Sequence, residues 1–118
     1  MIKDRLHEVE LAIDEARARR TLVPQDEPVR LIAVTKNHGI EEMREAIDAG
    51  AADIGENRIQ EAVGKKDTLQ RDVTWHLIGH LQTNKARQAV QYFDLIHSVD
   101  SEHLARAIDR EAGKIGKV

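Results

Sequence analysis

The stretch that decides the fold reads Val29-Arg30-Leu31-Ile32-Ala33-Val34-Thr35-Lys36. Its β-branched content, with a proline just before it and a glycine-containing run just after it, predicts a buried strand over residues 29–36. Side chains alternate along a strand, so Ile32, Val34 and Lys36 share one face and the lysine continues an apolar surface. In parallel α/β folds, ligands bind at this C-terminal end of the strands. Such a lysine either extends into solvent, which the stretch alone favours, or is partly desolvated and able to form a Schiff base.

Three further strands follow at an even spacing, each preceded by a predicted helix. They begin near residues 52, 74 and 95, about twenty-two residues apart, and cover residues 52–56, 73–78 and 95–99. The apolar spacing predicts helices from Ile40 to a stop at Gly50, over 58–63 with an end near Gly64, over 83–91 with Thr83 as cap, and after Ser101. The last of these has Leu104, Ala105, Ile108 and Ala112 on one face. An amphipathic helix over residues 1–20 and a linker over 21–28 precede the first strand.

This alternation predicts an α/β fold of four βα units with a parallel sheet and an additional N-terminal helix. Right-handed βα crossovers lead either to an open, doubly wound sheet or to a sheet that curls into a barrel. No G-x-G-x-x-G motif follows the first strand, so the pattern does not favour a dinucleotide-binding site.

Composition narrows the functional classes. The 118 residues carry a net charge of −3, which provides no basic field for nucleic acid. No apolar run is long enough to cross a bilayer and no secretory signal opens the sequence, so we expect a cytoplasmic protein without a membrane partner. The chain contains no cysteine, which excludes disulfides and thiol catalysis.

The polar residues at the strand ends should meet along one rim of the sheet. They are Lys36, His38, Glu56, Asn57, Gly79, His80, Ser98 and Asp100. Each also has an ordinary explanation, and Asn57 and Ser101 would both serve as helix caps. A Ser98–His80–Asp100 triad lacks a nucleophile elbow.

The histidines at 76 and 80 have the four-residue spacing of a metal pair. Such a pair works best on a helix, whereas here the spacing spans a strand and a glycine-containing loop, so we expect no metal. A third histidine, His97, is expected to be a packing residue inside the fourth strand.

Four motifs occur in the order and spacing of a known family. They are Ala33-Val34-Thr35-Lys36, Gly55-Glu56-Asn57, the run from Trp75-His76-Leu77-Ile78-Gly79-His80-Leu81-Gln82 to Thr83-Asn84-Lys85, and Asp94-Leu95-Ile96-His97-Ser98-Val99-Asp100-Ser101. On these motifs the chain resembles the pyridoxal phosphate homeostasis proteins, the YggS or PROSC family, which are relatives of the N-terminal barrel of alanine racemase.

The resemblance implies that pyridoxal 5′-phosphate (PLP) is the cofactor and that Lys36 holds it as a Schiff base. Asn57 matches a polar residue near the cofactor, and His80 lies on the same rim. The implied function is intracellular PLP homeostasis, as a carrier or buffer that supplies PLP-dependent apo-enzymes, without a robust turnover reaction. One alternative is a PLP-dependent amino-acid racemase or related enzyme that uses Lys36 as its base, and another is a cofactor-free fragment that acts only as one half of an assembly.

Family members are about twice as long and form an eight-stranded (β/α)8 barrel. Residues 1–118 are therefore expected to form the N-terminal half of an alanine-racemase-like PLP-binding barrel, an incomplete domain whose phosphate cup lies elsewhere. The open edges at the first and last strands then favour self-association. The remaining lysines that follow Lys36 (Lys65, Lys66, Lys85, Lys114 and Lys117) are expected on helices or tails, where solvent keeps them charged.

Overall fold

The computed structural model describes residues 2–21, 24 and 27–118, and the predicted linker over 21–28 lies partly outside them. Four parallel strands form a single sheet in the order β1-β2-β3-β4. The strands are β1 (Ala33–Val34), β2 (Asp53–Glu56), β3 (Thr74–Leu77) and β4 (Leu95–Ile96). Between and around them lie α1 (Ile2–Arg19), α2 (Ile40–Asp48), α3 (Ile59–Leu69), the 3₁₀ turn η1 (Thr83–Lys85), α4 (Ala86–Tyr92) and α5 (Glu102–Lys114).

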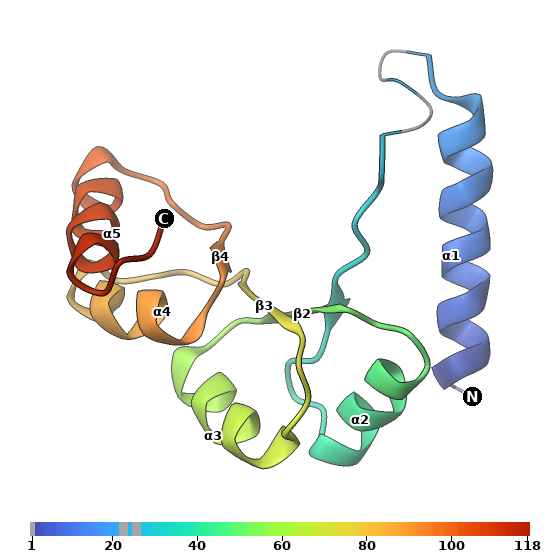
Figure 1. The fold of residues 1–118 in the computed structure, drawn as a ribbon, viewed down its shortest axis with the longest axis horizontal. Coiled ribbons are helices and arrows are strands. Elements are labelled where there is room, and N and C mark those ends of the chain that lie inside the picture. Colours follow the sequence, from blue (N-terminus) through green and yellow to red (C-terminus); the bar gives the residue numbers. More distant parts are fainter. Residues whose placement is uncertain (1, 22–23, 25–26) are drawn as a thin grey trace.

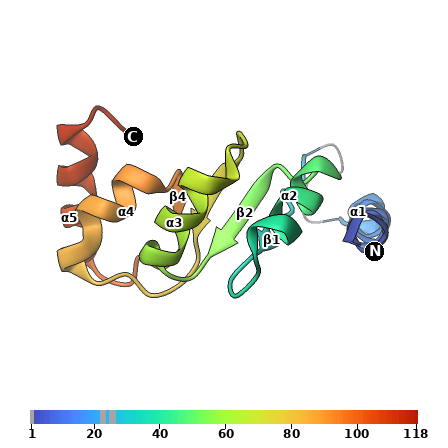
Figure 2. The same ribbon diagram turned by 90° about the horizontal axis from the view of Figure 1, so that it is seen from below.

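The helices follow the strands in chain order around one side of the sheet, as Figures 1 and 2 show. Sequential strand order with helices on one face is the arrangement of a (β/α)8 barrel, whereas a doubly wound fold places helices on both faces. The structure thus confirms the predicted α/β class and decides between the two alternatives. Its two edge strands are β1 and β4, as predicted.

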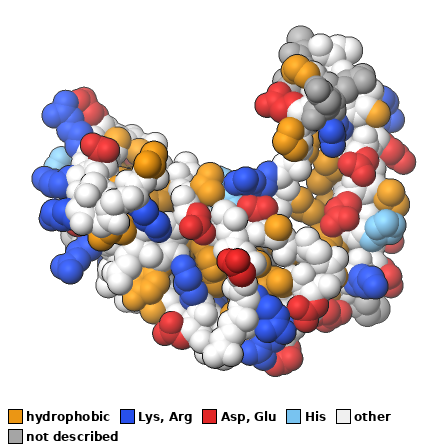
Figure 3. Space-filling model, in the orientation of Figure 1, with side chains coloured by type: hydrophobic (Ala, Val, Ile, Leu, Met, Phe, Trp, Pro, Cys, Tyr) orange, Lys and Arg blue, Asp and Glu red, His pale blue; other side chains and the backbone are white. Residues whose placement is uncertain are grey.

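Apolar side chains on the two faces of the sheet differ in burial. Ile54, Trp75 and Leu77 point towards the helices and are at most 2% exposed. On the opposite face, Val34 and Leu95 are 48% and 39% exposed. Figure 3 shows the molecule hollowed on this side, between the arm formed by α1 and the arm formed by α4 and α5. The hydrophobic core therefore lies between the sheet and the helices.

The strands are shorter than the sequence predicts. Strand β1 covers only Ala33–Val34, whereas the sequence predicts a strand over 29–36. The register pairs Ala33 with Ile54, so the residues before Ile32 would face the turn that follows α2 rather than β2. Residues 29–31 therefore have no β2 residue opposite them, and the β1–β2 ladder does not extend to them. One backbone bond, from Thr35 N–H to Gly55 O at 3.0 Å, extends the pairing towards Lys36.

Two helix predictions are wrong in detail. Helix α3 does not end near Gly64 but continues to Leu69, and Gln70 ends it in a left-handed conformation with φ 51°. A glycine inside a helix costs only about 1 kcal/mol, which the buried side chains of Ile59, Ala62 and Leu69 offset. Thr83 begins a 3₁₀ turn and makes no side-chain cap.

The remaining helix predictions are largely confirmed. The N-terminal helix forms, although none of its described side chains is fully buried. Helix α2 starts at Ile40, and Gly50 follows it with φ 118°. Ser101 caps α5 by accepting a hydrogen bond from Leu104 N–H at 3.1 Å. On α5, Leu104 and Ala112 are buried as expected but Ala105 is exposed.

Candidate functional site

Lys36 lies in a β-turn at the C-terminal end of β1. The turn is closed by a 3.1 Å hydrogen bond from His38 N–H to Thr35 O, which places Lys36 at its first central position. The second central residue, Asn37, has φ 63°. A positive φ at this position characterises a type II turn, and asparagine tolerates it better than most residues. The Lys36 side chain is exposed, so the expected partial desolvation of its amine is not present in this structure.

A buried ionic cluster lies beneath this turn. Glu56, at the end of β2, is fully buried, and its Oε1 accepts hydrogen bonds from Thr35 Oγ1 at 2.6 Å and from Lys65 Nζ at 2.8 Å. The Lys65 side chain, from α3, is only 11% exposed. The expectation that solvent surrounds Lys65 is therefore wrong, because the carboxylates of Glu56 and Glu61 surround its ammonium instead.

Electrostatics keep Lys65 and Glu61 ionised. Burial acts to lower the pKa of Lys65, but the hydrogen bonds and charges of Glu56 and Glu61 outweigh burial and raise that pKa above its ordinary value of 10.5. The pKa of Glu61 is lowered from 4.5, first by the hydrogen bond from Asn37 N–H and then by the one from Lys65. Lys65 therefore remains a cation and Glu61 an anion across the neutral range.

Asn57 and His80 lie together at the ends of β2 and β3. Both line a hollow of about 330 Å³ with Arg58, Gln82 and Lys85 among its other lining residues. Gly79 allows the approach, because a Cβ at that position would lie 2.8 Å from Asn57 Cα. The proposed capping role of Asn57 is wrong, since Arg58 is the N-cap residue of α3. Lys36 does not line this hollow.

The segment after β4 contacts the segment after β3. Exposed His80 and Asp100 approach each other to 4.0 Å between Nδ1 and Oδ2. Ser98 donates its hydroxyl hydrogen bond to Gly79 O rather than to His80. These residues therefore do not form a Ser-His-Asp triad.

A histidine chain on the open face of the sheet is a feature that the sequence analysis missed. Buried His76 contacts Asp53 Oδ1 through Nε2 at 2.8 Å and His97 Nε2 through Nδ1 at 2.9 Å. His76 thus bonds to residues of β2 and of the segment after β4, and not to His80. His97 is not a packed core residue, because its ring lies on the open face and is exposed. The strand register could have indicated the pairing, since His76 lies beside Leu95, and His97 follows Leu95 by two residues on the same face.

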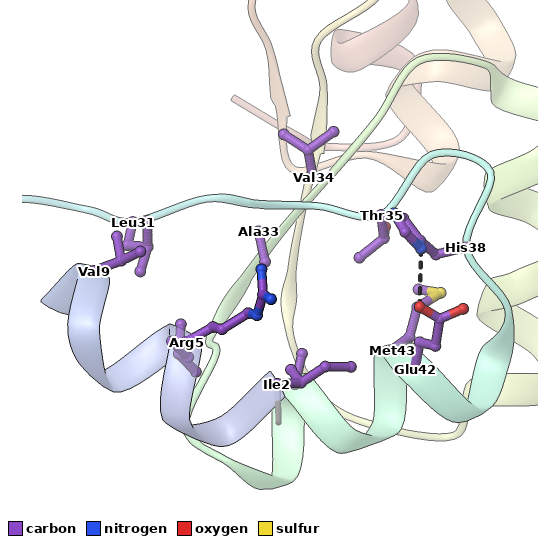
Figure 4. A pocket seen from close by; sticks show the side chains of 12 residues that line it. Ile2, Arg5, Val9, Leu31, Ala33, Val34, Thr35, His38, Glu42 and Met43 are labelled. Atoms are coloured by element: carbon purple, nitrogen blue, oxygen red, sulfur yellow. Dashed lines mark hydrogen bonds and ion pairs between the residues drawn. The ribbon is translucent and has the colours of Figure 1, made fainter.

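A mainly apolar groove reaches the rim at Thr35 and His38. It has a volume of about 340 Å³ and lies between α1, β1 and α2, where Figure 4 shows Ile2, Val9, Ala33 and Met43 around it. Ala33 and Thr35 point to this helix-covered side, whereas Lys36 follows the opposite alternation. Lys36 does not line the groove, although its neighbours Thr35 and His38 do.

The fold and the rim define an α/β protein built as part of a (β/α)8-type barrel, with a lysine after its first strand. The family described as "Alanine racemase, N-terminal domain" matches residues 13–118, and the chain belongs to this family.

Named relatives agree with this assignment. A "Pyridoxal phosphate homeostasis protein" from Synechocystis sp. is 47% identical over 91 residues, which are 75% of this chain and 42% of the relative. A protein of the same name from Corynebacterium glutamicum is 39% identical over 99 residues, 81% of this chain and 44% of the relative. The chain thus spans less than half the length of these two relatives.

Solved structures show the same relationship. PipY from Synechococcus elongatus, determined with PLP bound, has a TM-score of 0.79 and 47% sequence identity, and the match covers 98% of this chain and 50% of PipY. PipY without PLP has a TM-score of 0.81. The sheet and helices described above therefore correspond to one half of a PipY-like barrel. Within the described part of the chain, no helix is long and apolar enough to cross a membrane.

Proposed function

We propose that this chain binds PLP covalently through Lys36 and takes part in PLP homeostasis as a carrier or buffer. The observation that carries the proposal is the position of Lys36, an accessible amine in an ordered turn at the C-terminal rim of the sheet. The comparisons support the proposal because the chain is 47% identical, over nearly its whole length, to a PipY structure that contains PLP.

The residues at the rim fit one end of PLP. PLP supplies an aldehyde and, once bound, an electron-accepting ring. Lys36 would hold PLP through the amine of its side chain, which can condense with an aldehyde. Asn57, held beside Gly79, offers an amide that can orient the ring, and His80 borders the same hollow. The proposed domain is the N-terminal half of an alanine-racemase-like PLP-binding barrel, in which other residues hold the phosphate.

A carrier is favoured over a racemase because the described rim offers no tyrosine as a second base. Tyr92, the single tyrosine of the sequence, ends α4. Because α4 begins near the rim and runs back along the sheet, its last residue lies at the opposite end from Lys36. Racemisation with Lys36 as base is the competing function, and assays with L-alanine and other amino acids test it.

The remaining parts of the proposal concern partners and location. Apo-enzymes that need PLP are the proposed recipients, and the cytoplasm is the proposed compartment, which fractionation of cells producing a tagged chain would test. The unpaired backbone of β1 and β4 supports self-association of the chain, or pairing with a complementary half.

A PLP titration followed by absorbance tests the binding proposal. Wild-type protein should develop the band of a protein-bound Schiff base, and Lys36→Met should abolish it. Lys114→Met removes another exposed lysine, on α5, and should leave the band unchanged. Equal bands in wild type and Lys36→Met would refute Lys36 as the attachment site, and rapid racemisation would favour the enzyme.

A further inference from the structure

We propose that Lys65 is a positioning residue for Lys36: with Glu56 and Glu61 it fixes the turn that presents the Lys36 amine to PLP. This inference rests on the proposed function. Lys65 belongs to α3. It contacts Thr35, the residue before Lys36, directly, and it reaches Asn37, the residue after Lys36, through Glu61. The sequence around Lys65 by itself indicates only a charged helix surface.

The first contact fixes the residue before Lys36. Lys65 Nζ donates to Thr35 O at 2.8 Å, the same carbonyl that closes the turn by accepting from His38 N–H. The Thr35 hydroxyl in turn donates to Glu56 Oε1 at 2.6 Å. Backbone and side chain of Thr35 are therefore both held by the cluster, and the start of the turn cannot rotate without breaking bonds to charged groups.

The second contact fixes the residue after Lys36. Asn37 N–H donates to Glu61 Oε1 at 2.9 Å, and Lys65 Nζ lies 3.0 Å from the same oxygen. Asn37 has φ 63°, a conformation that costs energy for a residue with a side chain and persists when surrounding bonds stabilise it. The Lys65–Glu61 pair supplies that stabilisation at the strained position.

Charge compensation makes Lys65 the central member of the cluster. Glu56 is fully buried, and within the described residues its Oε2 has no hydrogen-bond partner, so both of its contacts converge on Oε1. Lys65 is the cation that contacts this carboxylate at 2.8 Å. A buried carboxylate without its cation is strongly unfavourable, so loss of Lys65 should force Glu56 and the attached Thr35 to rearrange.

The neighbouring lysine provides a matched control. Lys66 lies on the same helix and is also partly buried, but its Nζ donates to Tyr92 O at 3.0 Å and lies over Trp75. Lys66→Met therefore removes a charge and a hydrogen bond from the same helix without touching the turn. Lys65→Arg keeps a cation and donors at the proposed position. Glu61→Ala removes the Asn37 contact without leaving a buried, unpaired carboxylate, and serves if Lys65→Met does not fold.

Amide hydrogen exchange of the PLP-free protein tests the turn directly. Lys65→Met and Glu61→Ala should speed exchange at Asn37 and His38 by about tenfold or more, the effect expected from losing a hydrogen bond to a charged group. Lys66→Met should leave exchange at these two amides unchanged. Unchanged exchange in folded Lys65→Met and Glu61→Ala would overturn the inference.

Borohydride fixation of PLP, quantified at Lys36 by peptide mapping, tests the consequence. Lys65→Met should reduce the labelling rate at Lys36 roughly ten- to a hundredfold, as misplacement of a reacting group does. Lys66→Met should have no effect, and Lys65→Arg should retain most of the labelling. Equal rates in wild type and Lys65→Met would overturn the inference. Absence of Lys36 labelling in wild type would instead refute the proposed function, while the exchange measurement would still decide whether Lys65 fixes the turn.

Discussion

Gly79, which follows β3, packs against the backbone of Asn57, which follows β2, and replacing it with alanine should be strongly destabilising. A Cβ at this position would lie 2.8 Å from Asn57 Cα and 2.9 Å from its carbonyl carbon, and closer still to the carbonyl oxygen. These are backbone atoms, so no side-chain rotation can relieve the overlap. Gly79 does not have a positive φ, so the expected effect is steric and not conformational.

The magnitude follows from the cost of forcing extra atoms into a packed region. Overpacking of this kind costs about 1–3 kcal/mol, and displacement of the Asn57 backbone places Gly79→Ala at the upper end. Gly64→Ala is the matched control, because Gly64 lies inside α3 and an added Cβ would meet no atom within 4 Å. Alanine there should stabilise the protein by about 0.5–1 kcal/mol through helix propensity.

Denaturant unfolding followed by circular dichroism measures both changes. The two variants should move the midpoint in opposite directions and differ by about 2–4 kcal/mol in the free energy of unfolding. A Gly79→Ala protein as stable as wild type, or one more stable than Gly64→Ala, would refute the assigned packing of Gly79 against Asn57.

Three further outcomes are expected. Asn57→Ala should weaken PLP retention while leaving the melting temperature near that of wild type, since Asn57 is not the cap of α3; a lower melting temperature with unchanged affinity would contradict this role. The folded-state pKa of Glu61 lies below 4.5, so the stability it contributes is present above pH 4.5 and is lost as pH falls through the lowered pKa. The folded-state pKa of Lys65 lies above 10.5, so the stability it contributes is complete below pH 10.5 and is lost as pH rises through the raised pKa. Unfolding measured against pH should show both limbs, and Glu61→Gln should flatten the acidic one. Sedimentation should show self-association at tens of micromolar, since β1 and β4 expose unpaired backbone, and a monomer that binds PLP tightly would contradict that expectation.

The fold was predictable because the spacing of apolar residues, which indicates helices and strands, depends only on residues close together in the sequence. The even spacing of apolar runs correctly predicted four parallel strands, and Ser101 correctly predicted the start of α5. The boundaries were less predictable because they depend on distant partners. Strand β1 does not extend back to residues 29–31 because they have no β2 residue opposite them, and α3 continues past Gly64 because the core compensates for the glycine.

The site was only partly predictable for the same reason. The alternation of side chains identified Lys36 as a rim residue, and the parallel topology explains why Asn57 and His80 share a hollow. Lys65, however, is far from Thr35 in the chain, and nothing in its own sequence neighbourhood distinguishes it from Lys66. Only the packing of α3 against the end of β1 shows that one lysine holds the turn and the other holds α4.

The most direct test of the central proposal is the location of PLP on the wild-type protein. The purified chain would be incubated with PLP, reduced with borohydride and digested, and the modified lysine identified by mass spectrometry of the peptides. Because Lys36 is exposed like several other lysines, selective labelling would reflect the properties of its site and not accessibility alone. The expected result is a single dominant label on Lys36. Label spread evenly over the other exposed lysines, with Lys36 unmodified, would contradict the proposal.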